Sequence, residues 1–139
     1  MTHSDGNTGE EDRLRAHPKE RFGSQETAID LPSALRTLRD EAITSRQGHR
    51  QITLDQSGPV TLMLFAFEEG GRMNDHQAAG VVIIQALEGE LVVSTDAEEY
   101  KLRPNMLVVL APGVRHGVQA AQASAMLLTV CLANKEGDR

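Results

Sequence analysis

From about residue 50 onward, the apolar residues of the chain come in strand-length runs. The segment HRQITLDQ alternates apolar and polar positions around Ile52 and Leu54, and VTLMLFAFE is a longer apolar run, typical of a strand covered on both faces. Further runs rich in Val, Leu and Ile follow at intervals of roughly eight to twelve residues, and the last extends from about Ser124 to Ala133. This spacing predicts an antiparallel double-sheet sandwich or barrel rather than a parallel α/β sheet.

One segment ahead of these strands has a helical period. Its apolar residues are Leu31, Leu35, Leu38 and Ala42, which share one helix face. Asp30 is suited to cap the N-terminus, and Pro32 fits the first turn, where its missing N–H is not needed. We therefore expect a helix over about residues 31–43 that packs on the outside of the β domain or against a partner subunit.

Both ends of the chain are polar. Residues 1–21 contain Leu14 as the one sizeable apolar side chain, too little burial to offset the entropy of ordering, so we expect a disordered or loosely attached tail. Residues 22–48 then form an N-terminal segment with the helix, residues 49–133 the β barrel, and residues 134–139 a polar C-terminal end. The length suits one domain.

Charge and composition exclude several classes of function. The net charge of −6 and the absence of any Lys and Arg run argue against binding to nucleic acid, whose phosphates would be repelled. The chain has three Phe, one Tyr and no Trp, so it lacks the aromatic surface that stacks bases or sugars.

The sequence also bears on location. It has no basic start followed by an apolar stretch and no apolar run near the ~18 residues of a membrane span, so we expect neither secretion nor membrane insertion. The single cysteine, Cys131, excludes an intramolecular disulfide and suits a reducing cytoplasm. Its apolar setting, LLTVCLA, predicts a buried and unreactive thiol.

Two segments between Gly70 and His116 each carry one histidine beside a glycine-containing turn. His76 lies in GGRMNDHQAAGVVIIQALEGE and His116 in LRPNMLVVLAPGVRHGV, each next to β-branched runs that suit a strand. This spacing resembles the two motifs of the cupin superfamily, G-x5-H-x-H-x3-E-x6-G and G-x5-P-x-G-x2-H-x3-N. The matching positions are Gly70, His76, Gly89, Gly113 and His116. The departing positions are Ala78 at the second histidine, Val82 at the glutamate, and Asn105, Ala111 and Ala120 in the second motif.

The resemblance, which covers roughly residues 50–132, implies an all-β fold: a double-stranded β-helix or jelly-roll barrel, here with one N-terminal helix. In metal-binding cupins three imidazoles and a carboxylate hold a transition metal inside the barrel, and of that set only His76 and His116 are matched. Two neutral imidazoles leave a divalent cation short of ligands and of compensating charge. We therefore expect either no cofactor or a weakly bound divalent transition metal (Zn, Fe, Mn or Ni), with His49 as the candidate third ligand.

Other residues are expected to surround the two histidines. Strand alternation from Val82 places Ile84 on the same wall of the cavity, which predicts a small and mostly apolar pocket. Arg115 adjoins His116 and is a candidate to attract a carboxylate or phosphate. Gln119 follows His116 and is expected near the same end of the barrel.

Three functions are open at this point. The first is a metal-free or weakly metal-binding module that takes a small organic molecule in the barrel pocket as a cytoplasmic homodimer. The second is a metal-dependent oxygenase or isomerase that uses His76, His116 and His49 as ligands. The third is an interaction scaffold with a filled core. The range of reactions on this fold does not select among them.

Overall fold

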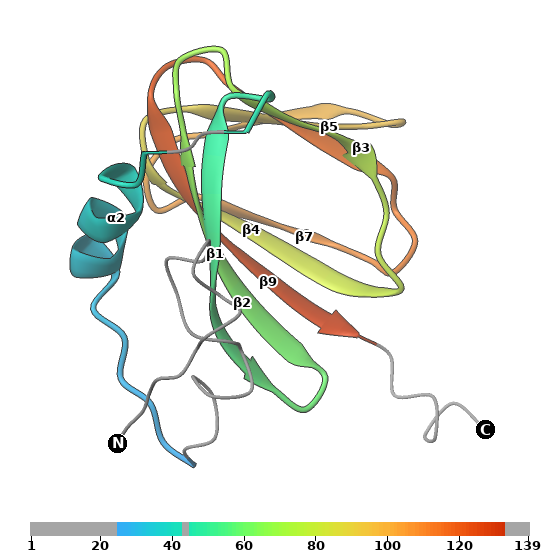
Figure 1. The fold of residues 1–139 in the computed structure, drawn as a ribbon. Helices are drawn as coiled ribbons and strands as arrows, with labels where there is room; N and C mark the ends of the chain where they lie inside the picture. The colour runs from blue at the N-terminus through green and yellow to red at the C-terminus, as the bar shows by residue number, and fades with distance from the viewer. Residues whose placement is uncertain (1–24, 43–44, 133–139) are drawn as a thin grey trace.

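The computed structural model describes residues 25–42 and 45–132, and within this part of the chain nine strands form two antiparallel sheets beside one short helix (Figure 1). The first sheet has the order β1-β2-β9-β4-β7 and the second the order β3-β8-β5-β6. The strands are β1 (His49–Ser57), β2 (Val60–Phe67), β3 (Arg72–His76), β4 (Gly80–Glu88), β5 (Leu91–Thr95), β6 (Glu99–Leu102), β7 (Leu107–Leu110), β8 (His116–Ala120) and β9 (Ser124–Leu132).

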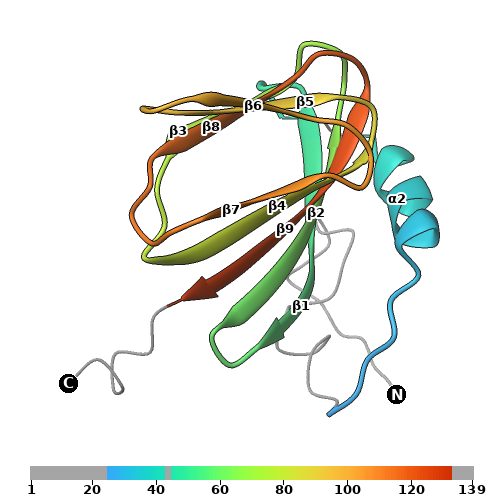
Figure 2. The ribbon, with the colours of Figure 1, turned by 180° about the vertical axis from the view of Figure 1, so that it is seen from behind.

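The two sheets face each other, as the view from behind shows (Figure 2). Their facing sides share one apolar core. Strand β4 alternates strictly, so that Val82, Ile84 and Ala86 are buried against the second sheet while their neighbours are only half-buried. The core is completed by Phe65, Phe67, Leu91, Val93, Leu102, Leu110, Val118, Ala120, Met126 and Leu128. Burial of large aliphatic side chains is the main stabilising contribution to a sandwich of this kind.

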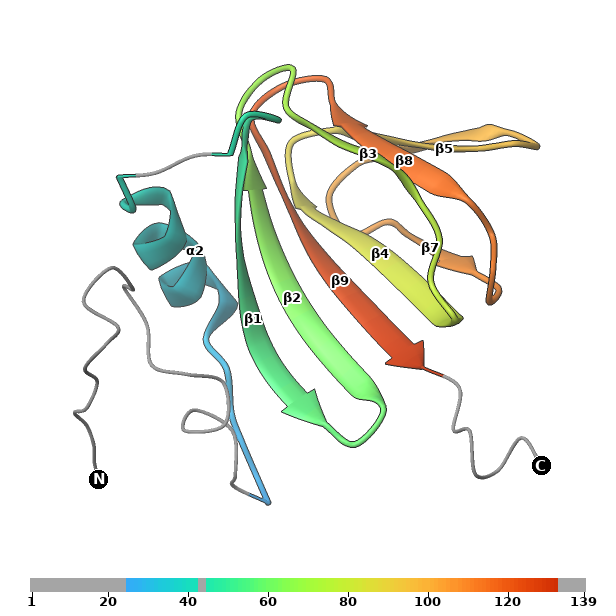
Figure 3. The ribbon, with the colours of Figure 1, turned by 45° about the vertical axis from the view of Figure 1, so that its right-hand side comes forward.

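The helix α2 (Leu31–Arg39) lies on the outer face of the first sheet, beside β1 and β2 (Figure 3). Asp30 caps it by accepting a hydrogen bond from the backbone N–H of Ser33 at 3.0 Å. Leu35 and Leu38 are buried in a second, smaller cluster with Leu64, Ala66 and Ala125. The leucine stripe of the helix therefore packs against the first sheet of the same chain. The helix ends at Arg39, earlier than the expected residue 43, and the N–H of its C-cap residue, Asp40, donates to the carbonyls of Arg36 and Thr37.

The predicted all-β double-sheet fold with one N-terminal helix is confirmed. The expected polar tail at residues 1–21 and the polar end at 134–139 lie outside the described residues, as do residues 43 and 44. In the part of the chain that is described, no helix has the length and apolar character needed to cross a membrane. The prediction of a buried thiol was wrong: Cys131 is exposed, because it stands near the end of β9, on the outer side of the sheet.

Candidate functional site

Two histidines far apart in the sequence lie side by side on the second sheet. Strand β3 pairs with β8, and in this register His76 stands opposite His116. Their ring centroids are 4.4 Å apart with an interplanar angle of 58°. Residues directly opposite each other share a face of the sheet, here the inner face that also carries Val118. These two rings, called the histidine pair below, form the candidate site.

The two rings of the histidine pair are oriented in the same way. His76 Nδ1 lies 3.2 Å from the carbonyl oxygen of Asn74, and His116 Nδ1 lies 3.1 Å from the carbonyl oxygen of Val114. A carbonyl only accepts, so in each ring the Nδ1–H is the donor. Each histidine is thus fixed by the backbone two residues earlier, which leaves Nε2 as the nitrogen that faces away from its own strand.

His116 is only 1% exposed, and its Nε2 atom is buried without a hydrogen-bond partner. Burial is the main cause that lowers the pKa of His116 below its ordinary value of 6.5; His76 adds to this effect, while the Val114 carbonyl and Asp75 oppose it. Burial therefore favours the neutral ring, in which Nε2 carries a lone pair. An unpartnered buried polar atom costs about 1–3 kcal/mol, and such an atom calls for an explanation.

The two histidines differ in access and in support. His116 belongs to β8, which has β3 on one side and β5 on the other, whereas His76 ends the edge strand β3 and is exposed. The register between β3 and β8 is also interrupted between Met73 and His76. Within the pair, His76 is therefore in contact with solvent and His116 is buried beside it.

Thr95 is a further polar residue in the cross-strand row of the histidine pair. On the other side of His116, strand β5 places Thr95 opposite it. The Thr95 hydroxyl is engaged in the turn that follows, where it contacts the carbonyl of Glu98 at 3.3 Å and accepts from the N–H of Ala97 at 3.2 Å. The sequence analysis missed Thr95 because no motif marks it; only the register of β5 and β8 reveals it.

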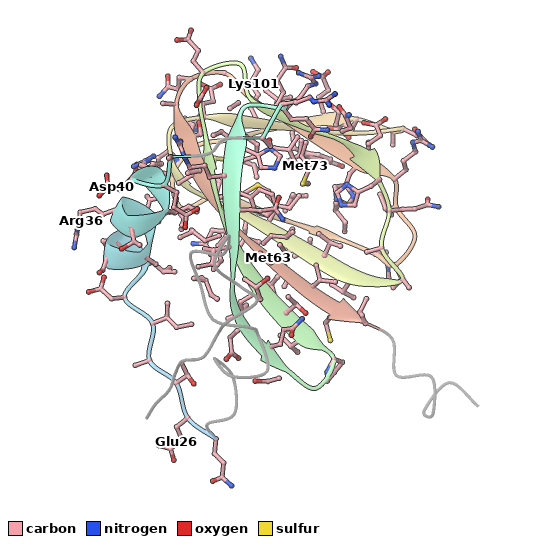
Figure 4. The ribbon with its side chains drawn as sticks, viewed as in Figure 1. Glu26, Arg36, Asp40, Met63, Met73 and Lys101 are labelled. Atoms are coloured by element: carbon pink, nitrogen blue, oxygen red, sulfur yellow. The ribbon has the colours of Figure 1, made fainter. Side chains whose placement is uncertain are left out.

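The walls near the histidine pair are apolar. The expected wall residues Val82 and Ile84 face inward from β4, but both are packed in the core, at 3% and 0% exposure. Met73, Ala78 and Val114 are partly buried and pack against the same core. Met73 and Met63 approach this interior from the two opposite sheets (Figure 4).

His49 does not join the histidine pair. Its ring is buried against Phe65 and Phe67, at centroid distances of 5.3 and 5.4 Å. Its Nδ1 lies 3.0 Å from the Arg72 carbonyl, and its Nε2 lies 3.0 Å from the side-chain oxygen of Gln51. Both nitrogens thus have hydrogen-bond partners within the protein, so neither is directed at the histidine pair.

Arg115 and Gln119 lie outside the barrel. Gln119 is three residues from His116, and an odd spacing on a strand puts the two side chains on opposite faces. Arg115 is 60% exposed and pairs with Asp75 at 3.6 Å. Both line an open hollow of about 390 Å³ on the outer face of the second sheet. Gly117 stands between them, where a Cβ atom would collide with the Asp75 carboxylate.

The residues present do not fit the resident metal of the metal-binding cupins. The family's second-histidine and glutamate positions hold Ala78 and Val82, which have no donor atoms. Throughout residues 25–42 and 45–132, no three or more His, Cys, Asp or Glu side chains are grouped to hold an ion. Two imidazoles without an anionic ligand leave a divalent cation poorly compensated in an apolar interior.

Comparison with known families and structures agrees with this fold. A family model for the AraC-like ligand binding domain matches residues 59–129, just over half of the chain. No curated protein matches the sequence.

Solved structures give the same result. A cupin superfamily protein from Desulfitobacterium hafniense is 23% identical with a TM-score of 0.64, and covers 79% of this chain and 94% of its own. A conserved protein of unknown function from Streptococcus pyogenes is 21% identical with a TM-score of 0.63, covering 80% and 91%. An RmlC-like cupin from Shewanella frigidimarina is 18% identical with a TM-score of 0.60, covering 71% and 90%. At these identities the likeness shows the cupin fold alone.

Proposed function

Since the chain belongs to the family of AraC-like ligand binding domains, we propose that it binds a small organic molecule between its two sheets, at the histidine pair. The observation that carries the proposal is the buried, unpartnered Nε2 of His116. A protein that left this atom unsatisfied would lose stability without gain, whereas a ligand that bonds to it recovers that loss. The exposed His76 provides the approach.

The surroundings favour a compact and mostly apolar ligand. Met73, Ala78 and Val114, which flank the two histidines in sequence, are partly buried against the apolar core. An apolar wall with a few convergent polar atoms is the usual composition of a small-molecule site. A sugar needs many hydrogen bonds and an aromatic platform, and the chain has only four aromatic residues other than histidine.

Metal is not required by this function. The alternative, a metal-dependent oxygenase or isomerase, would use the Nε2 atoms of His76 and His116 as two ligands. Among the described residues no third ligand joins them, because His49 is engaged elsewhere. We propose that any divalent ion is absent or weakly held. The expected cytoplasmic location stays part of the same proposal.

We also propose that the chain forms a homodimer. The large apolar side chains that are exposed in the described part of the chain are Met106, Leu107, Val109 and Leu132, at 39, 52, 57 and 46%. Three of them lie on β7 or directly before it, and β7 is an edge strand of the first sheet. An exposed apolar edge is a template for association with another strand. A second copy that covers this edge is the partner we propose, because the helix stripe is already buried on its own sheet.

The experiment is a screen of uncharged fragments, each with an aromatic or aliphatic body, by isothermal titration and ligand-detected NMR. We expect at least one fragment to bind the wild type and to lose tenfold or more in affinity in His116→Leu. Gln119→Ala is the matched control, since it changes a side chain on the outer face of the same strand. No binding at millimolar fragment, or binding that His116→Leu leaves unchanged, contradicts the proposed site.

A further inference from the structure

We infer that the ligand of this site presents hydrogen-bond donors, N–H or O–H groups on an apolar body, and not a carboxylate or phosphate. The inference rests on the proposed function and adds the chemical class of the ligand. It follows from which nitrogen of each ring holds its hydrogen.

His116 fixes the first acceptor. Its Nδ1–H is committed to the Val114 carbonyl at 3.1 Å. A second hydrogen on Nε2 would make the ring a cation with a buried and unpaired N–H, which is the more costly of the two states in an apolar interior. The ring therefore stays neutral, and the unpartnered Nε2 is an acceptor.

His76 provides the second acceptor by the same geometry. Its Nδ1–H is committed to the Asn74 carbonyl at 3.2 Å, so Nε2 is the nitrogen left to accept a hydrogen bond from a ligand. The two rings are 4.4 Å apart. A primary amine or amide has two hydrogens on one nitrogen, and a hydroxyl has one, so a single donor group of the ligand is able to serve one or both acceptors.

The neighbouring polar side chains do not supply a donor for an anion. The Thr95 hydroxyl is bonded within its turn. Arg115, the cation nearest in sequence to His116, is paired with Asp75 on the outer face of the sheet. Met73, Ala78 and Val114, which are partly buried against the same core, have no N–H or O–H in their side chains. A buried carboxylate would meet lone pairs there, and repulsion excludes it.

The first test reads the tautomers directly in the full chain without any ligand. Long-range ¹H–¹⁵N correlation spectra of ¹⁵N-histidine protein at pH 7.5 are expected to show an unprotonated Nε2 and a protonated Nδ1 for both His76 and His116. His76→Phe and His116→Phe assign the signals. An Nε2–H tautomer at His116 overturns the inference.

The second test uses matched fragments: benzamide against N,N-dimethylbenzamide, phenol against anisole, and benzoate as the anion. We expect the donor of each pair to bind at least tenfold more tightly than its methylated partner, and this ratio to fall toward one in His76→Phe/His116→Phe. Benzoate is expected not to displace the bound donor fragment.

The experiments distinguish a failure of the donor inference from a failure of the proposed function. Equal or tighter binding of the methylated fragments, or displacement by benzoate, overturns the donor inference and leaves the site intact. If no fragment of either kind binds, both the proposed function and the donor inference are overturned.

Discussion

At the scale of single residues, two buried histidines of this domain have opposite hydrogen-bonding situations. Both nitrogens of His49 are bonded, whereas His116 has one bonded nitrogen and one orphan. Net stability depends less on a polar atom's presence than on whether it has a partner. The same substitution should therefore have different effects at the two positions.

The prediction is that His49→Leu destabilises the protein by roughly 1–3 kcal/mol, because it removes a buried ring whose two nitrogens are bonded, to the Arg72 carbonyl and to Gln51. His116→Leu is expected to lie within about 1 kcal/mol of wild type, or to be more stable, because it removes the orphaned nitrogen along with one bond to Val114. Urea unfolding of both variants measures the difference. A larger loss at position 116 than at 49 would show that the orphan has a partner in solution.

The second residue-scale prediction concerns pH. Burial lowers the pKa of His116 in the folded state below the ordinary value of 6.5, so the unfolded chain takes up a proton first as the pH falls. Stability from this group is therefore complete above pH 6.5 and is lost as the pH drops through the lower folded pKa. The slope cannot exceed about 1.4 kcal/mol per pH unit for one proton. His116→Leu should flatten the profile between pH 7 and 5 in urea unfolding, and an unchanged profile would refute the assignment to this residue.

These residues also show what the sequence can and cannot predict. His76 and His116 were predicted from the spacing of two motifs, because motif spacing encodes strand length and turn position. Their neighbours were harder to predict. Gln119 was expected at the pocket, but its odd spacing from His116 reverses its face. His49 faces inward too, but only the position of β1 along the sheet, beside Phe65 and Phe67, removes it from the pair.

At the scale of secondary-structure elements, β7 is an edge strand that exposes apolar side chains. Its outward side chains Leu107 and Val109 are more than half exposed, and its inward side chains Val108 and Leu110 belong to the core. Substitutions on the outer side therefore change the surface and leave the core intact.

We predict that Leu107→Thr/Val109→Lys weakens self-association at least tenfold, because it places a charge on the edge that the second copy would cover. Its effect on folding of the monomer should stay within about 0.5 kcal/mol for each exposed position. Sedimentation equilibrium over a concentration series measures the dissociation constant, with Gln119→Lys on the other sheet as control. A wild-type chain that remains monomeric throughout the series would contradict the proposed dimer. A double variant that dimerises like the wild type would show that the dimer interface does not include β7.

At the scale of the whole molecule, two sheets and one covering helix are held by apolar packing, without disulfide or grouped metal ligands in the described residues. The period of two in the strands and the turn residues between them made this fold predictable from the sequence. The sequence did not predict which outer faces of the sheets are covered. The exposure of Cys131, for example, depends on where β9 ends and on whether another element covers that part of the strand.

The corresponding prediction is that chelation does not alter stability. Treatment with excess EDTA should leave the melting temperature of the purified protein unchanged, and metal analysis should find well below one ion per chain. An ion that bound the folded state tightly would stabilise it by mass action, by about 2.7 kcal/mol at one hundred times its dissociation constant, and its removal would be visible. A clear drop in melting temperature with EDTA, reversed by one added metal, would reinstate the metal-dependent alternative.

The uneven anchoring of β3 and β8 has a last consequence for selectivity. His116 is held by strands on both sides, while His76 ends an edge strand whose ladder is already broken after Met73. Amide hydrogens of β3 should therefore exchange faster than those of β8. A ligand would contact one rigid residue, His116, and one adjustable residue, His76. Related ligands that share a hydrogen-bond donor but differ in size should therefore bind with similar affinity. Such tolerance would suit a receptor for a chemical class rather than for a single compound.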